Sequence, residues 1–114
     1  MPQLFLNKGK WEGRQIVSAE WAEKSGSALR ILSPKSGQTY GYLWNSFAYD
    51  YKGRKVHAYF AGGNGGQVSI GIPELNLVIA MTGGNYADGA MFRSQRQFVP
   101  LDILPAVSEP VTRR

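Results

Sequence analysis

The stretch YFAGGNGGQVSIGIPELNLVIAMT (residues 59–82) decides the fold expected for this chain. Within it, residues 67–72 alternate between polar and apolar side chains, which is the period of a strand with one buried face. Pro73 ends that strand, and a tight connection leads to residues 77–82. This second run is apolar on both faces, which predicts a central strand covered on two sides. Strands joined by so short a connection pair antiparallel.

Four glycines occupy the five positions 62–66, between two predicted strands. A phosphate-binding loop needs its glycines between a strand and a helix, and no Gly-Lys-Ser/Thr follows here, which disfavours that reading. A flexible linker fits equally poorly, because both flanks are apolar and periodic. Glycine inside strands indicates a bulge, or the close approach of another backbone or a ligand. Two interpretations stay open: tight packing, or a strand edge that lines a substrate cleft with free N–H groups.

The segments before this stretch predict a hairpin and a loop. Residues 41–47 and 55–61 are strand-like, and Gly53 lies in the turn that joins them. Residues 26–39 are rich in Gly, Ser and Pro, so we expect an internal loop there.

The two ends of the chain predict helices. Ser18 is a good N-cap for a short helix over 19–25, and residues 3–6 resemble the end of another helix. Residues 90–107 carry apolar side chains at helical spacing, with Pro100 best suited to a helix start. The order helix, strands, helix predicts an α+β fold, in which an antiparallel sheet has flanking N- and C-terminal helices.

Bulk composition narrows the class of protein. The chain has 114 residues, a single-domain length, and 43% of them are hydrophobic, which indicates a globular protein. No run approaches the roughly 20 apolar residues of a membrane span. The N-terminus has no signal-peptide core, and the sequence is compatible with either the periplasm or the cytoplasm of a bacterium. The net charge of +5 is scattered, apart from residues 52–55 in the hairpin turn, so we expect neither nucleic acid nor membrane as a partner.

Groups able to perform chemistry are few. His57 is the only histidine, the acidic residues do not cluster and cysteine is absent, so we expect no metal site and no cofactor. The serines occur in no G-x-S-x-G or S-x-x-K pattern. The residues alone therefore show no pair of nucleophile and base.

Four segments together carry a resemblance to a known family. They are LFLNKGKWEGRQIVSAEW, YGYLWNSF, YFAGGNGGQVSIGIPELNLVIAMTGGNY and DILPAV. In this order they resemble the C-terminal part of the β-lactamase-related, penicillin-binding-protein-like serine hydrolases, which include class C β-lactamases, esterases and D-aminopeptidases. The resemblance spans about residues 3–107. It implies part of a β-lactamase/transpeptidase-like fold.

The resemblance also implies a site at the glycine run. The family's third motif, K-T-G or H-x-G, lies on a strand beside the cleft, and it aligns here either with Phe60-Ala61-Gly62 or with Ala61-Gly62-Gly63. Phe60 or Ala61 then replaces the family's lysine or histidine, which favours esterase or amidase activity over true β-lactamase activity. The N–H of Gly63 or of Asn64 would be the oxyanion-hole donor.

The family's nucleophile motif S-x-x-K and its Y-x-N motif are absent from this chain. We therefore expect residues 1–114 to be a single partial domain, the C-terminal segment of such a hydrolase, without catalytic residues and inactive alone. The substrate of the full-length protein would be a small ester, amide or lactam. The alternative is a non-catalytic binding or oligomerisation module, and self-association through uncovered sheet fits either reading.

Overall fold

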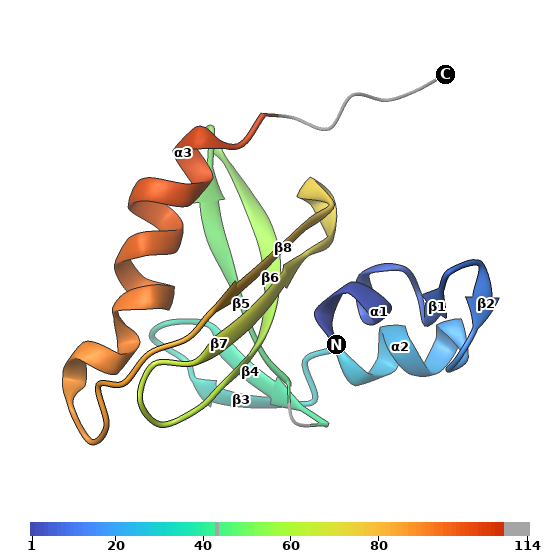
Figure 1. The fold of residues 1–114 in the computed structure, drawn as a ribbon, viewed down its shortest axis with the longest axis horizontal. Helices are drawn as coiled ribbons and strands as arrows, with labels where there is room; N and C mark the ends of the chain where they lie inside the picture. Colours follow the sequence, from blue (N-terminus) through green and yellow to red (C-terminus); the bar gives the residue numbers. More distant parts are fainter. Residues whose placement is uncertain (43, 109–114) are drawn as a thin grey trace.

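The computed structural model describes residues 1–42 and 44–108, and it shows an α+β fold built on one six-stranded antiparallel sheet (Figure 1). The strands follow one another in chain order across the sheet. They are β3 (Arg30–Ser33), β4 (Gln38–Gly41), β5 (Trp44–Tyr51), β6 (Arg54–Gly62), β7 (Val68–Ile72) and β8 (Leu77–Met81). The predicted α+β class and antiparallel sheet are confirmed.

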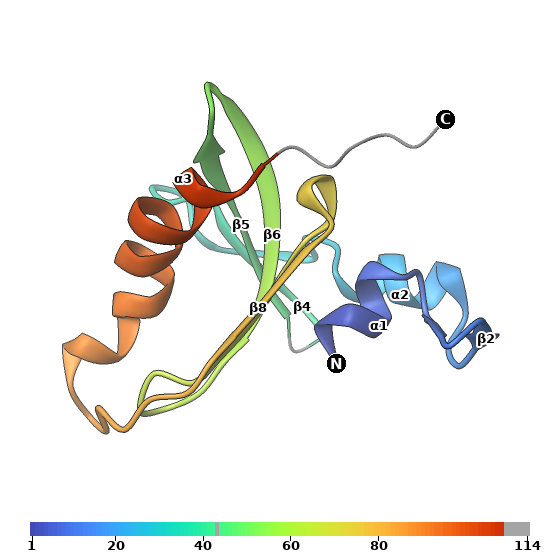
Figure 2. The ribbon, with the colours of Figure 1, turned by 45° about the horizontal axis from the view of Figure 1, so that its top comes forward.

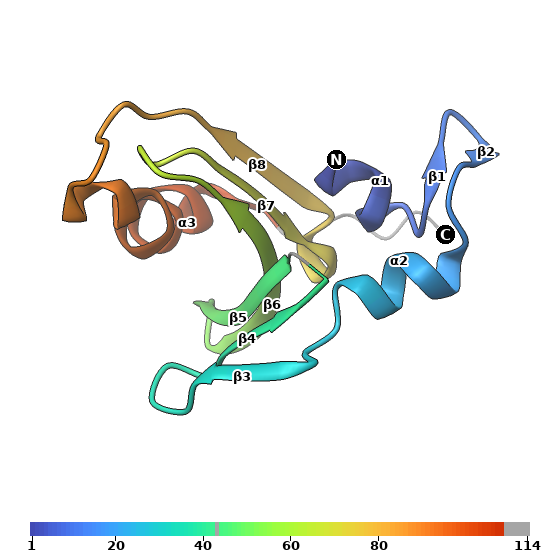
Figure 3. The same cartoon turned by 90° about the horizontal axis from the view of Figure 1, so that it is seen from below.

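Helices lie at both ends of the chain. Before the sheet come α1 (Pro2–Leu6), the small ribbon of β1 (Lys10–Trp11) and β2 (Arg14–Gln15), and α2 (Ala19–Ser25). After the sheet comes the C-terminal helical segment, residues 89–106, made of η2 (Gly89–Phe92), η3 (Ser94–Ile103) and α3 (Leu104–Ala106). Figures 2 and 3 show this segment on one side of the curved sheet and α1 and α2 toward the other.

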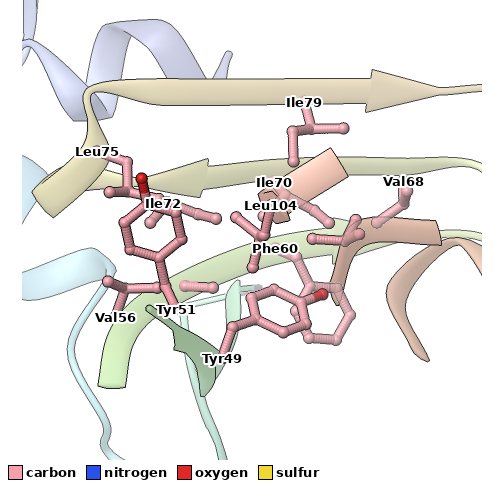
Figure 4. Close-up of a cluster of buried hydrophobic side chains, with 12 residues drawn as sticks. Tyr49, Tyr51, Val56, Phe60, Val68, Ile70, Ile72, Leu75, Ile79 and Leu104 are labelled. Carbon is pink, nitrogen blue, oxygen red and sulfur yellow. The ribbon is translucent and has the colours of Figure 1, made fainter. Parts of the chain in front are cut away.

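Strand alternation separates the two faces of the sheet. Val56, Ala58 and Phe60 of β6 point to the core face, which the C-terminal helical segment covers, and Ile70 of β7 pairs directly with Phe60. Figure 4 shows Phe60 and Ile70 close to Leu104 of the C-terminal helical segment. The apolar members of this core are Tyr49, Tyr51, Val56, Ala58, Phe60, Val68, Ile70, Ile72, Leu75, Ile79, Val99 and Leu104.

Local turn chemistry explains the connections. Lys52 and Gly53 both have positive φ, 45° and 82°, as a two-residue type I′ hairpin turn requires. The 3-10 turn η1 (Pro73–Leu75) joins β7 to β8 and ends at left-handed Asn76. The predicted cap is confirmed, because the Ser18 side chain accepts a hydrogen bond from the N–H of Trp21 at 3.1 Å.

Three sequence predictions are wrong in detail. Residues 26–39 are not a continuous loop, because β3 and the start of β4 form a hairpin there, held by pairing of β4 with β5. Residues 77–82 contain an edge strand, not a central one, because β8 pairs only with β7 among the described residues. Pro100 lies inside η3 and not at a helix start; it has no N–H for the carbonyl oxygen of Gln95 five residues earlier, and that oxygen accepts from the Tyr49 hydroxyl instead. None of the described helices is both long and apolar enough to cross a bilayer.

Candidate substrate cleft at the glycine turn

The glycine run forms the turn between β6 and β7. Gly62 is the last residue of β6 and pairs with Val68 of β7, so the turn proper is residues 63–67. Gly65 and Gly66 have φ values of 102° and 98°, a backbone conformation that glycine adopts without strain. The glycine turn lies beside the segment that follows β8, as Figures 1 and 2 show. There Gly65 pairs with Asn85, so close approach of two backbones is one reason for the glycines.

Hydrogen bonds inside the turn distinguish the two predicted oxyanion donors. The N–H of Gly63 donates to the carbonyl oxygen of Gln67 at 2.9 Å, which closes the turn. The N–H of Asn64, by contrast, donates to no group in the described part of the chain. The Asn64 side chain instead anchors the turn, because its Oδ1 accepts from the N–H of Ala87 at 3.0 Å. Of the two candidates, only Asn64 offers a backbone donor that the turn does not use.

A cleft of about 570 Å³ opens at this end of the sheet, on the core face. Three parts of the chain form its walls: the glycine turn, the ends of β4 to β6, and the start of the C-terminal helical segment. Its lining residues are Ser36, Gln38, Asn45, Phe47, Phe60, Gly62, Gly63, Asn64, Met91, Phe92, Gln95 and Arg96. A volume of this size suits a small-molecule ligand.

Four of the five predicted site residues line this cleft. Phe60 contributes its ring, which meets Phe47 edge-on at 5.2 Å, and Gly62, Gly63 and Asn64 form the turn wall. Ala61 does not line the cleft. Its neighbours on β6 point to the core face, so Ala61 points to the opposite face, where it borders a shallow depression with Ser69 and Ala80.

The polar groups of the cleft are mostly neutral. Gln38 Nε2 donates to Asn45 Oδ1 at 3.1 Å, and the hydroxyl of Tyr49, which does not itself line the cleft, donates to the carbonyl oxygen of Gln95 at 2.9 Å. Arg96 is the one charged residue among the described lining residues, and its guanidinium lies 4.8 Å from the centroid of the Phe92 ring. Burial raises the pKa of Tyr49, so this tyrosine is a neutral donor.

No family model matches this chain, and no curated protein matches it.

The remaining candidates for chemistry lie elsewhere. His57 lies on β6 with its side chain on the opposite face of the sheet, beside a mainly apolar cavity of about 370 Å³ between α1, α2 and the sheet. Burial raises the pKa of its neighbour Tyr59 to about 12, and the Tyr59 hydroxyl donates to the Pro2 carbonyl oxygen at 3.0 Å. Within the described residues, no histidine, lysine or carboxylate lines the cleft, and no three metal-ligating side chains gather anywhere.

Apart from Phe60, the sequence did not indicate the residues of two of the three walls. Ser36 and Gln38 lie in the segment predicted as a loop, and Gln95 and Arg96 lie in the C-terminal helical segment, far from the glycine run in sequence. No local motif marks these residues. Pairing of β4 with β5 brings Ser36 and Gln38 to the cleft, and the packing of residues 89–106 across the sheet brings Gln95 and Arg96 there.

Proposed function

We propose that this chain is the C-terminal part of a β-lactamase-related serine hydrolase, of esterase or amidase type, and that the cleft is one wall of its acyl-transfer site. The observation that carries the proposal is the unused backbone N–H of Asn64, a residue that lines the cleft. A donor held by a closed turn can stabilise the negative charge that develops on an acyl oxygen in the transition state. The proposed fold is the part of a β-lactamase/transpeptidase-like fold that contains the third-motif strand, here β6.

The glycine turn suits this role on geometric grounds. Gly62 and Gly63 carry no side chain, so a flat acyl group can lie against the end of β6. The hydrogen bond from Gly63 to Gln67 and the one from Ala87 to Asn64 hold the donor in place before a ligand arrives. Such preorganisation is what makes an oxyanion hole effective, because no reorganisation is needed during the reaction.

This chain supplies no nucleophile to the cleft. Ser36 is the one hydroxyl among its described lining residues, and no described base lies beside it there. The proposal therefore places the S-x-x-K serine and the Y-x-N tyrosine in a portion of the parent protein that precedes residue 1. The 114-residue chain should show no burst of acylation with a fluorescent penicillin or a p-nitrophenyl ester.

The deciding experiment reads the coding sequence upstream of Met1 and expresses the longer frame. We expect S-x-x-K and Y-x-N in that frame, together with hydrolysis of p-nitrophenyl esters. In that protein, Asn64→Pro removes the N–H and should lower kcat about 100-fold or more. Asn64→Ala is the matched control, because it removes the side-chain contact to Ala87 but keeps the N–H.

Two results would overturn the proposal. One is an upstream frame without both motifs. The other is an equal loss of kcat in Asn64→Pro and Asn64→Ala, with circular dichroism showing both variants folded, since the backbone donor would then have no role of its own.

A further inference from the structure

The main chain of Gln95, in the C-terminal helical segment, is fixed to the sheet beside the cleft. Pro100 supplies no N–H to the carbonyl oxygen of Gln95, and the hydroxyl of the buried Tyr49 of β5 donates to that oxygen at 2.9 Å. This hydrogen bond joins two elements that are far apart in sequence. The side chain of Gln95 therefore starts from a defined position at the cleft.

The Gln95 side chain lies over the bare end of β6. A Cβ added to Gly62 would lie 3.3 Å from Gln95 Nε2 and 3.7 Å from Cε2 of the Phe60 ring. All three residues line the cleft. The place that a side chain at position 62 would occupy is thus bordered by an amide and by an aromatic ring. A flat ligand group that lies against Gly62 meets both.

The amide of Gln95 is available to a ligand. Its Nε2 donates to no group in the part of the chain that the structure describes, and solvent reaches this atom. A ligand that covers the amide without offering an oxygen removes its water and leaves the donor unpaired, which weakens binding. A ligand that offers an oxygen acceptor keeps the hydrogen bond. The amide therefore discriminates between ligands that differ by one acceptor.

We propose that Gln95 selects substrates whose acyl group carries, beside a flat apolar part, an oxygen acceptor other than the reacting carbonyl. Gln95 Nε2 donates to that second oxygen, the Phe60 ring contacts the apolar part, and the N–H of Asn64 serves the reacting carbonyl. The inference rests on the proposed hydrolase function, which makes the ligand an acyl group, whereas the contact with Gln95 can be tested without hydrolysis.

Two aromatic acids test the contact in the 114-residue chain. In β-benzoylpropionate a ketone oxygen replaces two hydrogens of γ-phenylbutyrate, and the two acids share their ring, length and charge, so any attraction to Arg96 cancels. In titrations followed by nuclear magnetic resonance, the keto acid should bind about 3- to 10-fold more tightly. Gln95→Met keeps the length of the side chain without the amide and should abolish this preference.

Gln97→Met is the matched control. Gln97 lies in the same helical segment, is exposed and does not line the cleft, so this variant should keep the preference for the keto acid. Gly62→Ala is an independent variant, because its methyl group takes the place beside Gln95 and should weaken the binding of both acids. Equal affinity of the wild-type chain for the two acids, or the same loss of preference in Gln95→Met and Gln97→Met, would overturn the role of Gln95.

Hydrolysis separates this role from the proposed function. In the protein expressed from the longer frame, Gln95→Met should raise KM for the p-nitrophenyl ester of the keto acid with little change in kcat, because the contact exists before the reaction. Asn64→Pro should lower kcat instead. A longer frame without esterase activity would overturn the hydrolase and with it the substrate. A keto-acid preference that only Gln95→Met removes would still establish Gln95 as the ligand contact.

Discussion

The backbone N–H of Gly63 donates to the carbonyl oxygen of Gln67, 2.9 Å away, and this hydrogen bond closes the turn between β6 and β7. Because the N–H of Gly63 is used in this way, it cannot donate to a ligand, whereas the N–H of Asn64, a residue that lines the cleft, can. One hydrogen bond thus selects between two residues that are equivalent in the sequence pattern.

Amide hydrogen exchange provides a direct check of this assignment. We expect the Gly63 amide to be protected and the Asn64 amide to exchange at nearly the rate of an unstructured chain, because only the first is hydrogen-bonded. Nuclear magnetic resonance of the labelled chain measures both. Protection of Asn64 equal to that of Gly63 would contradict the geometry described for the turn.

Glycine at position 65 should be far less replaceable than glycine at position 84. Gly65 has a φ of 102°, and a Cβ there would lie 2.8 Å from the Tyr86 ring, whereas a Cβ at Gly84 would meet nothing within 4 Å. Gly65→Ala should therefore lower the free energy of unfolding by about 1–3 kcal/mol. Gly84→Ala, the control, should change it by less than about 0.5 kcal/mol. Urea unfolding measures both, and equal losses would argue against the close approach at Gly65.

Stability should fall at alkaline pH through Tyr59. Burial raises its pKa from 10.0 to about 12, so between these values the unfolded chain loses the tyrosine proton while the folded chain keeps it. The contribution is fully present below pH 10 and is lost as pH rises toward 12, with a total of about 2–3 kcal/mol. Tyr59→Phe should make this decline less steep in urea-unfolding measurements from pH 9 to 12, leaving the part that comes from Tyr49, whose pKa burial also raises. Tyr86→Phe, at a 65% exposed position, should not.

Arg96 should give the cleft a preference for anionic ligands, since no described acidic residue lines it or pairs with this guanidinium. Titration with phenylacetate should shift the amide signals of residues 92–96, and phenylacetamide should shift them less. Arg96→Gln should weaken phenylacetate binding about 5- to 10-fold, as expected for loss of one charge-assisted hydrogen bond.

Arg93→Gln is the matched control for that titration. It removes the same charge from the same helical segment, but Arg93 does not line the cleft. Equal weakening by both substitutions would show a general charge effect and not a contact made by Arg96.

The local elements were largely predictable because their signals lie within a few residues. Alternation in residues 67–72 specified β7, Gly53 marked the hairpin turn, and Ser18 marked the start of α2. The β3–β4 hairpin was not predictable in this way. Its residues are rich in turn formers, and their extended conformation depends on pairing with β5, a contact that no local pattern contains.

The position of β8 within the sheet could not be predicted from the sequence either. Its apolar sequence correctly indicates a strand, but whether a strand lies in the centre or at the edge depends on which other strands pair with it. The structure places it last in the sheet. An apolar sequence by itself therefore does not distinguish a central strand from the last strand of a sheet.

By itself, the sequence determined the α+β class, the antiparallel hairpins and the place of the glycine turn between two strands, because periodicity and turn chemistry act over short distances along the chain. Only the tertiary structure decided which amide of that turn is free, that β8 comes last in the sheet, and that Arg96 lines the same cleft as Asn64. These features depend on contacts between residues far apart in sequence, whose energies appear only when the chain is packed.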